Sequence, residues 1–142
     1  LRYFSVYGPG QRPDMAYRKF INLALRGETI DLYGTGEQTR SNTYIDDCVS
    51  ATLSALTKGE PGEIYNIAGA AERSLNEALA IIEKHVGTPL SINSLPAARG
   101  DQQRTRGDTT KAQKTLGFRH TATLEEGLAA QIVWQRSLLL AP

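Results

Sequence analysis

The sequence predicts a mixed α/β fold, because short stretches with the two-residue period of strands alternate with longer stretches of helical period. Glycines follow the helical stretches, and Ser74-Leu-Asn-Glu77 has the form of a capping box at the start of one of them. Of the 142 residues, 40% are apolar, which can supply the core of one domain. We therefore expect a single domain over residues 1–142, with one core and no repeats.

The first half of the chain opens on an apolar strand that Gly8-Pro9-Gly10 ends. The following helix has apolar side chains three and four residues apart and stops at Gly27. Gly34-Thr-Gly36 predicts a tight turn that joins two strands into a hairpin, and Asp46 or Asp47 can N-cap the next helix. The expected elements are a strand at 1–7, a helix at 14–26, strands at 28–33 and 38–45, and a helix at 48–56.

The second half repeats this alternation and ends in helices. Gly69 ends a buried strand, the capping box starts a helix that Gly87 closes, and Thr109 or Thr110 caps a short helix. Thr123 starts an amphipathic C-terminal helix. The expected elements are strands at 63–68 and 90–95, helices at 75–86, 110–116 and 123–134, and a loop at 96–107.

Charge and cysteine content exclude several classes of protein. The 16 basic and 15 acidic residues give a net charge of +1, which argues against a nucleic-acid-binding protein. We expect no membrane association, because no apolar run is long enough to span a bilayer. We also expect a cytoplasmic location, because the lone Cys48 cannot form an internal disulfide. Cys48 is expected to be a packed core thiol. His85 and His120 lack ligand spacing, so no metal site is expected.

Several polar residues are candidates for phosphate or sugar binding. Arg40 lies on a strand among uncharged neighbours and could hold a phosphate with a bidentate pair, unless it is solvated or paired with a carboxylate. Arg12 follows the rigid Gly-Pro-Gly turn, although it could simply pair with Asp14. Arg99 and Asp101 offer a cation for phosphate and a carboxylate for ribose hydroxyls, or form an ordinary loop pair.

Ser5 is expected to share the face of Tyr3 near the end of the first strand, since alternate residues of a strand point to one side. The alternative is a core serine bonded to a backbone carbonyl. No catalytic set is visible: Gly34-Thr-Gly36 lacks the third glycine of a dinucleotide fingerprint, and no tyrosine has a lysine four residues later. If the chain belongs to an enzyme, it supplies substrate binding.

Six ordered motifs over essentially all 142 residues resemble the C-terminal half of an extended short-chain dehydrogenase/reductase in the nucleotide-sugar epimerase/dehydratase family. The motifs are Leu1-Arg-Tyr-Phe-Ser-Val-Tyr-Gly-Pro-Gly-Gln-Arg-Pro-Asp-Met15, Leu32-Tyr-Gly-Thr-Gly-Glu-Gln-Thr-Arg40, Thr43-Tyr-Ile-Asp-Asp47, Tyr65-Asn-Ile-Ala-Gly69, Gly100-Asp101 with Thr105, and Asp108-Thr-Thr-Lys-Ala112 with Leu116-Gly-Phe118. This implies the last strands of a Rossmann-like cofactor sheet and a small α/β substrate-binding domain.

The resemblance also implies roles for particular residues. Tyr3, Phe4 and Ser5 would lie beside the nicotinamide of NAD, with Ser5 also near the sugar. The substrate would be a UDP-sugar. Arg12 and Arg40 would contact its diphosphate or sugar acid, and Arg99 is a further candidate for this contact. Gln38 would line the nucleotide pocket, and Asp101 would form hydrogen bonds with the ribose hydroxyls. The complete enzyme is expected to be a homodimer.

Two departures from the family pattern affect these expectations. Ser5 stands where UDP-glucose enzymes often have Asn, and its hydroxyl is more similar to the UDP-glucuronate 4-epimerase branch, which usually has Thr. An acid-bearing sugar is therefore favoured. Ser41 replaces the Asp that commonly follows the hairpin arginine, so Arg40 is expected to lack the family's usual anchor.

The glycine-rich NAD-binding turn and the Tyr-x-x-x-Lys pair of the family precede the opening strand and are absent here, and the chain opens on Leu1 within a strand. We therefore expect a fragment that binds most of its NAD through a missing N-terminal portion and is inactive alone. Alternatives are a dehydratase, decarboxylase or reductase of the same family, a stand-alone UDP-sugar-binding module, or a structural domain without affinity for UDP.

Overall fold

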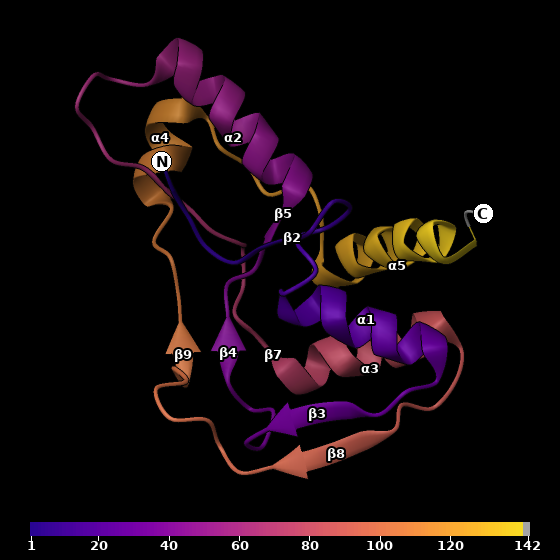
Figure 1. Cartoon of the computed structure of the whole chain (residues 1–142). Helices are drawn as coiled ribbons and strands as arrows, with labels where there is room; N and C mark the ends of the chain where they lie inside the picture. Colours follow the sequence, from indigo (N-terminus) through magenta and orange to yellow (C-terminus); the bar gives the residue numbers. More distant parts are fainter. Residues whose placement is uncertain (141–142) are drawn as a thin grey trace.

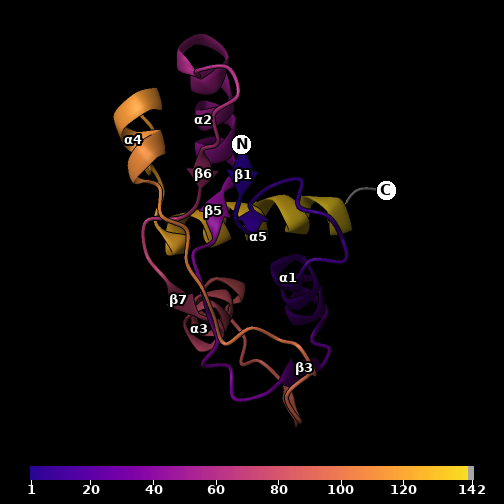
Figure 2. The same ribbon diagram turned by 90° about the vertical axis from the view of Figure 1, so that its left-hand side faces the viewer.

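The computed structural model describes residues 1–140 and places two groups of helices around a set of short strands (Figures 1 and 2). Helices α1 (Ala16–Arg26), α3 (Leu75–Val86) and α5 (Leu124–Leu140) pack on one another, and α2 (Ile45–Lys58) packs with α4 (Thr110–Leu116). Strands and helices alternate as the sequence predicts, so the α/β class is confirmed.

The opening strand is divided in two, contrary to the prediction of one strand over residues 1–7. Strand β1 (Arg2–Tyr3) runs parallel to β6 (Asn66–Ile67), and β2 (Val6–Tyr7) runs parallel to β5 (Thr43–Tyr44). Ser5 separates them with a φ of +28°. This break ends the two-residue alternation, so Ser5 does not share a strand face with Tyr3.

The predicted hairpin is also wrong. Strand β3 (Ile30–Tyr33) pairs in parallel with β8 (Ile92–Leu95) instead of with the next segment of chain. The segment expected as one return strand divides into β4 (Thr39–Arg40) and β5, which belong to different sheets. Alternation in the sequence shows that a segment is extended but carries no information about its partner, which here lies about 60 residues further on.

Strand β4 is the centre of the only three-stranded sheet within residues 1–140. It pairs antiparallel with β7 (Arg73–Ser74) and parallel with β9 (Arg104–Thr105). Strand β9 lies in the segment expected to be a loop, and two residues are too few to show a strand period.

The helix boundaries agree with the sequence more closely than the strands do. The capping box of α3 is present: the Ser74 hydroxyl accepts a bond from the Glu77 amide, and the Glu77 carboxylate accepts one from the Ser74 amide. The expected cap of α2 is wrong, because Tyr44 is its N-cap and makes no side-chain cap bond. Asp47 is buried and instead accepts two bonds from the amide and hydroxyl of Thr121.

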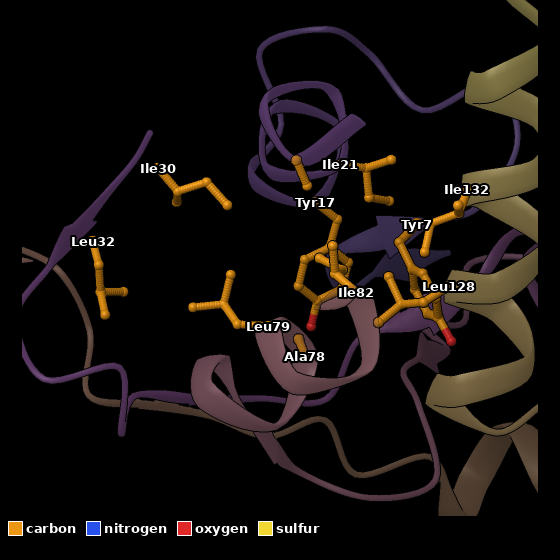
Figure 3. Packing of buried hydrophobic residues seen from close by; sticks show 11 residues of the cluster. Tyr7, Tyr17, Ile21, Ile30, Leu32, Ala78, Leu79, Ile82, Leu128 and Ile132 are labelled. Carbon is orange, nitrogen blue, oxygen red and sulfur yellow. The ribbon is translucent and has the colours of Figure 1, made fainter. Parts of the chain in front are cut away.

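Two clusters of buried side chains replace the single core expected from the sequence. The larger lies between α1, α3, α5 and β3 (Figure 3), with the members Tyr7, Tyr17, Ile21, Ala24, Ile30, Leu32, Ala78, Leu79, Ile82, Leu128 and Ile132. The smaller joins α2, α4 and β6 through Cys48, Ala51, Tyr65, Ile67, Ala112, Leu116 and Phe118. Cys48 is thus a core thiol, as predicted, and burial raises its pKa to about 11.

The described part of the chain lacks two features, a membrane-spanning helix and a cluster of metal ligands. Among residues 1–140, no helix has the length and apolar character needed to cross a bilayer. The same residues contain no cluster of three or more metal-ligating side chains.

Candidate functional site

A cleft of about 220 Å³ opens between the start of α1 and the sheet that contains β4 and β7. Its walls combine several polar side chains with apolar ones, and polar groups that converge on a pocket can fix the orientation of a bound small molecule. The lining residues are Ser5, Gln11, Met15, Ala16, Tyr17, Gln38, Arg40, Asn42, Arg73, Leu75 and Asp101.

Arg40 and Asp101 form the charged centre of this cleft. Nη2 of Arg40 donates to Oδ1 of Asp101 at 2.9 Å, and Nη1 donates to the carbonyl of Thr39 at 2.9 Å. Their side chains are 24% and 34% exposed, so the pair is shielded from solvent but reachable. A guanidinium fixed in this way is preorganised for an anion with two acceptor oxygens.

The sheet around Arg40 explains how it is held although Ser41 replaces the usual aspartate. The Thr39 amide donates to the Gln103 carbonyl at 2.9 Å, and the Ser41 amide donates to the Thr105 carbonyl at 3.0 Å. Ser41 itself is buried. Backbone pairing with β9, together with Asp101, therefore anchors Arg40.

Gln38 completes the polar wall beside Asp101. Its Nε2 donates to the Tyr33 carbonyl at 3.2 Å and lies 3.4 Å from Oδ2 of Asp101. The turn at Gly34 and Gly36 brings this side chain back toward the end of β3, and both glycines have positive φ. The turn expected from the sequence thus places Gln38 in the cleft even though it does not make a hairpin.

Buried glutamines of α5 hold the opposite wall of the cleft. Gln131 accepts a bond from the Gly8 amide at 2.9 Å and donates to Oε1 of Gln11 and Oε1 of Gln135 at 2.9 and 3.1 Å. Gln131 and Gln135 are both fully buried. This network was not predicted from the sequence, in which its signal is two glutamines four residues apart on an otherwise apolar helix face.

Tyr17 lines the cleft but is unsuited to accept a proton from a bound sugar. Its hydroxyl accepts a bond from Nδ2 of Asn42 at 2.6 Å, and burial raises its pKa above the ordinary value. Burial also raises the pKa of Tyr7 above the ordinary value. Neither phenol is therefore a base near neutral pH.

The structure brings four of the predicted site residues together, Ser5, Gln38, Arg40 and Asp101, and leaves the others outside the cleft. Arg12 is exposed and pairs with Asp14 at 3.0 Å, which is the alternative that the sequence left open. Arg99 is exposed on the loop before Asp101. Tyr3 shares a 2.7 Å hydrogen bond with Thr52 of α2, and the ring of Phe4 lies against Gly107.

The sequence and the fold of this chain both resemble those of known proteins. The model of the NAD dependent epimerase/dehydratase family matches residues 1–68. A crystal structure of the UDP-glucuronic acid 4-epimerase of Bacillus cereus, in complex with UDP-glucuronic acid and NAD, superposes with a TM-score of 0.92 and 37% identity. That match covers 96% of this chain and 44% of the other.

The chain matches the C-terminal part of the NAD-dependent epimerase/dehydratase family. The UDP-glucuronate 4-epimerase of Thermodesulfobacterium geofontis is 35% identical, over 96% of this chain and 42% of its own length. The dTDP-glucose 4,6-dehydratase of Streptomyces griseus is 33% identical, over 90% and 39%. This chain therefore spans less than half the length of these relatives. The comparisons confirm the resemblance to the epimerase/dehydratase family and the Rossmann-like fold class, both of which were predicted from the sequence.

Proposed function

We propose that the chain is the substrate-binding part of an NAD-dependent nucleotide-sugar 4-epimerase of the UDP-glucuronate or UDP-glucose type. The observation that carries this proposal is the meeting of Arg40 and Asp101 with Ser5 and Gln38 in one cleft. The resemblance to the Bacillus cereus and Thermodesulfobacterium geofontis enzymes supports the choice of substrate.

The cleft residues have distinct roles in this proposal. Arg40 binds the diphosphate through charge-assisted bonds, Gln38 lines the nucleotide, and Asp101 accepts bonds from the ribose hydroxyls. Ser5 faces the sugar. Arg12 and Arg99 remain predicted contacts of the phosphates or the sugar acid from outside the cleft. Such contacts would hold the sugar near its reactive geometry.

The first strand fits a place beside a dinucleotide. Tyr3, Phe4 and Ser5 stand at the C-terminal end of β1, where parallel sheets bind ligands, and within residues 1–140 only β6 pairs with β1. NAD, when bound, would supply the hydride acceptor. These three residues would shape and desolvate the nicotinamide side of the site.

We propose that these 142 residues alone do not catalyse epimerisation. No tyrosine in the sequence has a lysine four residues later, and burial keeps Tyr7 and Tyr17 protonated. The remaining part of the relatives would then provide the base and most of the NAD site. A homodimeric complete enzyme and a cytoplasmic location remain predictions.

Titration calorimetry with UDP tests the proposal. We expect Arg40→Ala to weaken UDP binding by ~1.5–3 kcal/mol, the usual range for a hydrogen bond to a charged group. Arg26→Ala, at the far end of α1, is the matched control and should bind like the unchanged chain. Absence of UDP binding to the unchanged chain would overturn the proposal.

The resemblance to the Streptomyces griseus enzyme favours a second candidate, a dTDP-sugar 4,6-dehydratase. A chain that binds dTDP more tightly than UDP would support this candidate over the epimerase. Mixing the chain with the N-terminal part of the Thermodesulfobacterium geofontis enzyme, NAD and UDP-glucuronate separates an epimerase part from a stand-alone binding module. Formation of UDP-galacturonate supports an epimerase part, whereas binding without conversion supports the module.

A further inference from the structure

Arg73 lies directly opposite Arg40 in the three-stranded sheet. Strands β4 and β7 are antiparallel, and their register pairs Arg40 with Arg73. Opposed residues of an antiparallel pair lie on the same face, within about 4.5–5.5 Å between their Cβ atoms. Both arginines accordingly line the cleft described above.

Like charges directly opposite each other destabilise a sheet. Arg40 and Arg73 also line a neighbouring cavity of about 280 Å³, so this pair of arginines borders two openings of the surface. A pair of this kind breaks the local rules of sheet stability, and such departures are expected where a ligand supplies the compensation.

Each arginine forms an ion pair with one carboxylate, and the two ion pairs differ in how exposed they are. Arg40 is paired with Asp101 in the cleft, whereas Arg73 pairs with Glu77 at 3.1 Å on the surface of α3, with the Arg73 side chain 53% exposed. An exposed ion pair of this kind contributes little to stability. Glu77 also keeps its bond to the Ser74 amide without Arg73. The Arg73 guanidinium can therefore leave Glu77 at little cost.

We propose that Arg73 is the second phosphate-binding arginine of the cleft and that it holds a nucleoside diphosphate together with Arg40. This inference rests on the proposed function and adds a residue to the same site. A diphosphate presents two groups of acceptor oxygens, each of which can accept a guanidinium fork. Arg12 and Arg99, the other arginines selected from the sequence, lie outside the cleft, so Arg73 provides the second cation inside it.

The test compares UDP with uridine, which lacks phosphate, on the complete chain. Dissociation constants are measured for the unchanged chain, Arg73→Gln, Arg73→Lys, Arg40→Gln and the distant control Arg26→Gln. We expect Arg73→Gln to raise the Kd of UDP about tenfold and to leave the Kd of uridine unchanged. Arg73→Lys, which keeps the charge but not the fork, should show a smaller rise, and Arg26→Gln none.

Thermal unfolding confirms that each variant is folded before the titration. If Arg73→Gln does not fold, Arg73→Lys is used for the test instead. The inference is then overturned if Arg73→Lys binds UDP with the same Kd as the unchanged chain.

The remaining outcomes separate this inference from the proposed function. If Arg40→Gln weakens UDP binding and Arg73→Gln does not, Arg73 is excluded while the cleft remains the nucleotide site. If Arg73→Gln weakens uridine as much as UDP, its effect comes from the shape of the cleft and the phosphate role is excluded. If the unchanged chain binds no UDP, both the proposed function and the role of Arg73 are excluded.

Discussion

At the scale of single residues, Ser5 connects backbone conformation to the cleft. Its φ of +28° makes it the one non-glycine residue with positive φ among residues 1–140. The change of direction moves the chain from its pairing with β6 to its pairing with β5, and it leaves Ser5 in the wall of the cleft. Serine seldom adopts this conformation, and here it occurs in the wall of the candidate site. Residues with strained backbone conformations are often found at functional sites.

Substitutions at Ser5 distinguish this bend from the regular strand that the sequence predicts. Asn tolerates positive φ, so Ser5→Asn should change the free energy of unfolding by less than about 0.5 kcal/mol. Val is β-branched and disfavours positive φ, so Ser5→Val should destabilise the chain by ~1–3 kcal/mol. Urea unfolding measures both values. A stabilising effect of Val would indicate a regular strand at this position.

The predicted site residues show what a sequence can establish about a cleft. Gln38, Arg40 and Asp101 could be selected because motifs with glycine turns surround them, and these turns bring the three side chains together. Arg73 and Gln131 could not be selected in this way. Arg73 owes its place to a strand register, and Gln131 to the packing of α5 on the Gly8 turn, and neither is a local property of the sequence.

At the scale of elements, helices were predictable and strand partners were not. The α3 capping box and the left-handed glycines after α1, α3 and α4 are local signals that the structure retains. The strands contain between two and four residues each, and most pair with segments far away in the sequence. Such pairings depend on how helices bring strands together, which no local period records.

Gly127 of α5 provides a test in which helix propensity and packing give opposite results. A Cβ atom at Gly127 would lie 2.5 Å from the Tyr7 hydroxyl and 2.8 Å from Cδ2 of Tyr44. Propensity alone predicts that Gly127→Ala stabilises the helix by about 1 kcal/mol. Because the buried ring of Tyr7 and the partly buried ring of Tyr44 would have to move, we expect a net loss of about 1–3 kcal/mol in the free energy of unfolding instead.

Ser137→Ala is the control for Gly127→Ala, because Ser137 is exposed on the same helix. Chemical denaturation of this variant should show a change of no more than about 0.5 kcal/mol. A Gly127→Ala chain that unfolds at higher denaturant concentration than the unchanged chain would show that α5 does not pack on Tyr7 and Tyr44 as described.

Glu72 links the strands of the three-stranded sheet and makes its stability depend on pH. Its carboxylate accepts bonds from Nη2 of Arg104 at 2.8 Å and from the hydroxyl of Thr39 at 3.2 Å. The bond from Arg104 is the main cause that holds the pKa of Glu72 below its ordinary value. The folded state therefore binds the proton less readily than the unfolded chain does.

This stabilisation is complete above the ordinary glutamate pKa and is lost as the pH falls through the lowered folded value. Between about pH 5 and pH 3, the unchanged chain should lose more unfolding free energy than Glu72→Gln, in which that position no longer titrates. Glu28→Gln, on an exposed residue before β3, should follow the unchanged chain. Parallel curves for Glu72→Gln and the unchanged chain would contradict this linkage.

At the scale of the whole molecule, an apolar stripe of helix α2 lies next to the first strand. Helix α2 presents Val49, Leu53 and Leu56 to solvent at spacings of four and three residues, so they form one stripe. Tyr3 lies against the same helix through its bond to Thr52, and β1 has β6 as its one partner within residues 1–140 (Figure 2). An apolar helix face therefore adjoins a strand edge that is free to pair.

We expect the 142-residue chain to self-associate through this surface, because exposed apolar patches and unpaired edges both favour contact between copies. Sedimentation velocity between about 10 and 200 µM should show a concentration-dependent increase in mass, in the range where weak association is visible. The double variant Val49→Ser, Leu53→Gln should reduce the association, since it makes the α2 stripe polar. Val133→Ser, at an exposed position of α5, should leave it unchanged. A monomer at all concentrations would show that the apolar face of α2 and the edge of β1 are too small to drive association in the absence of further chain.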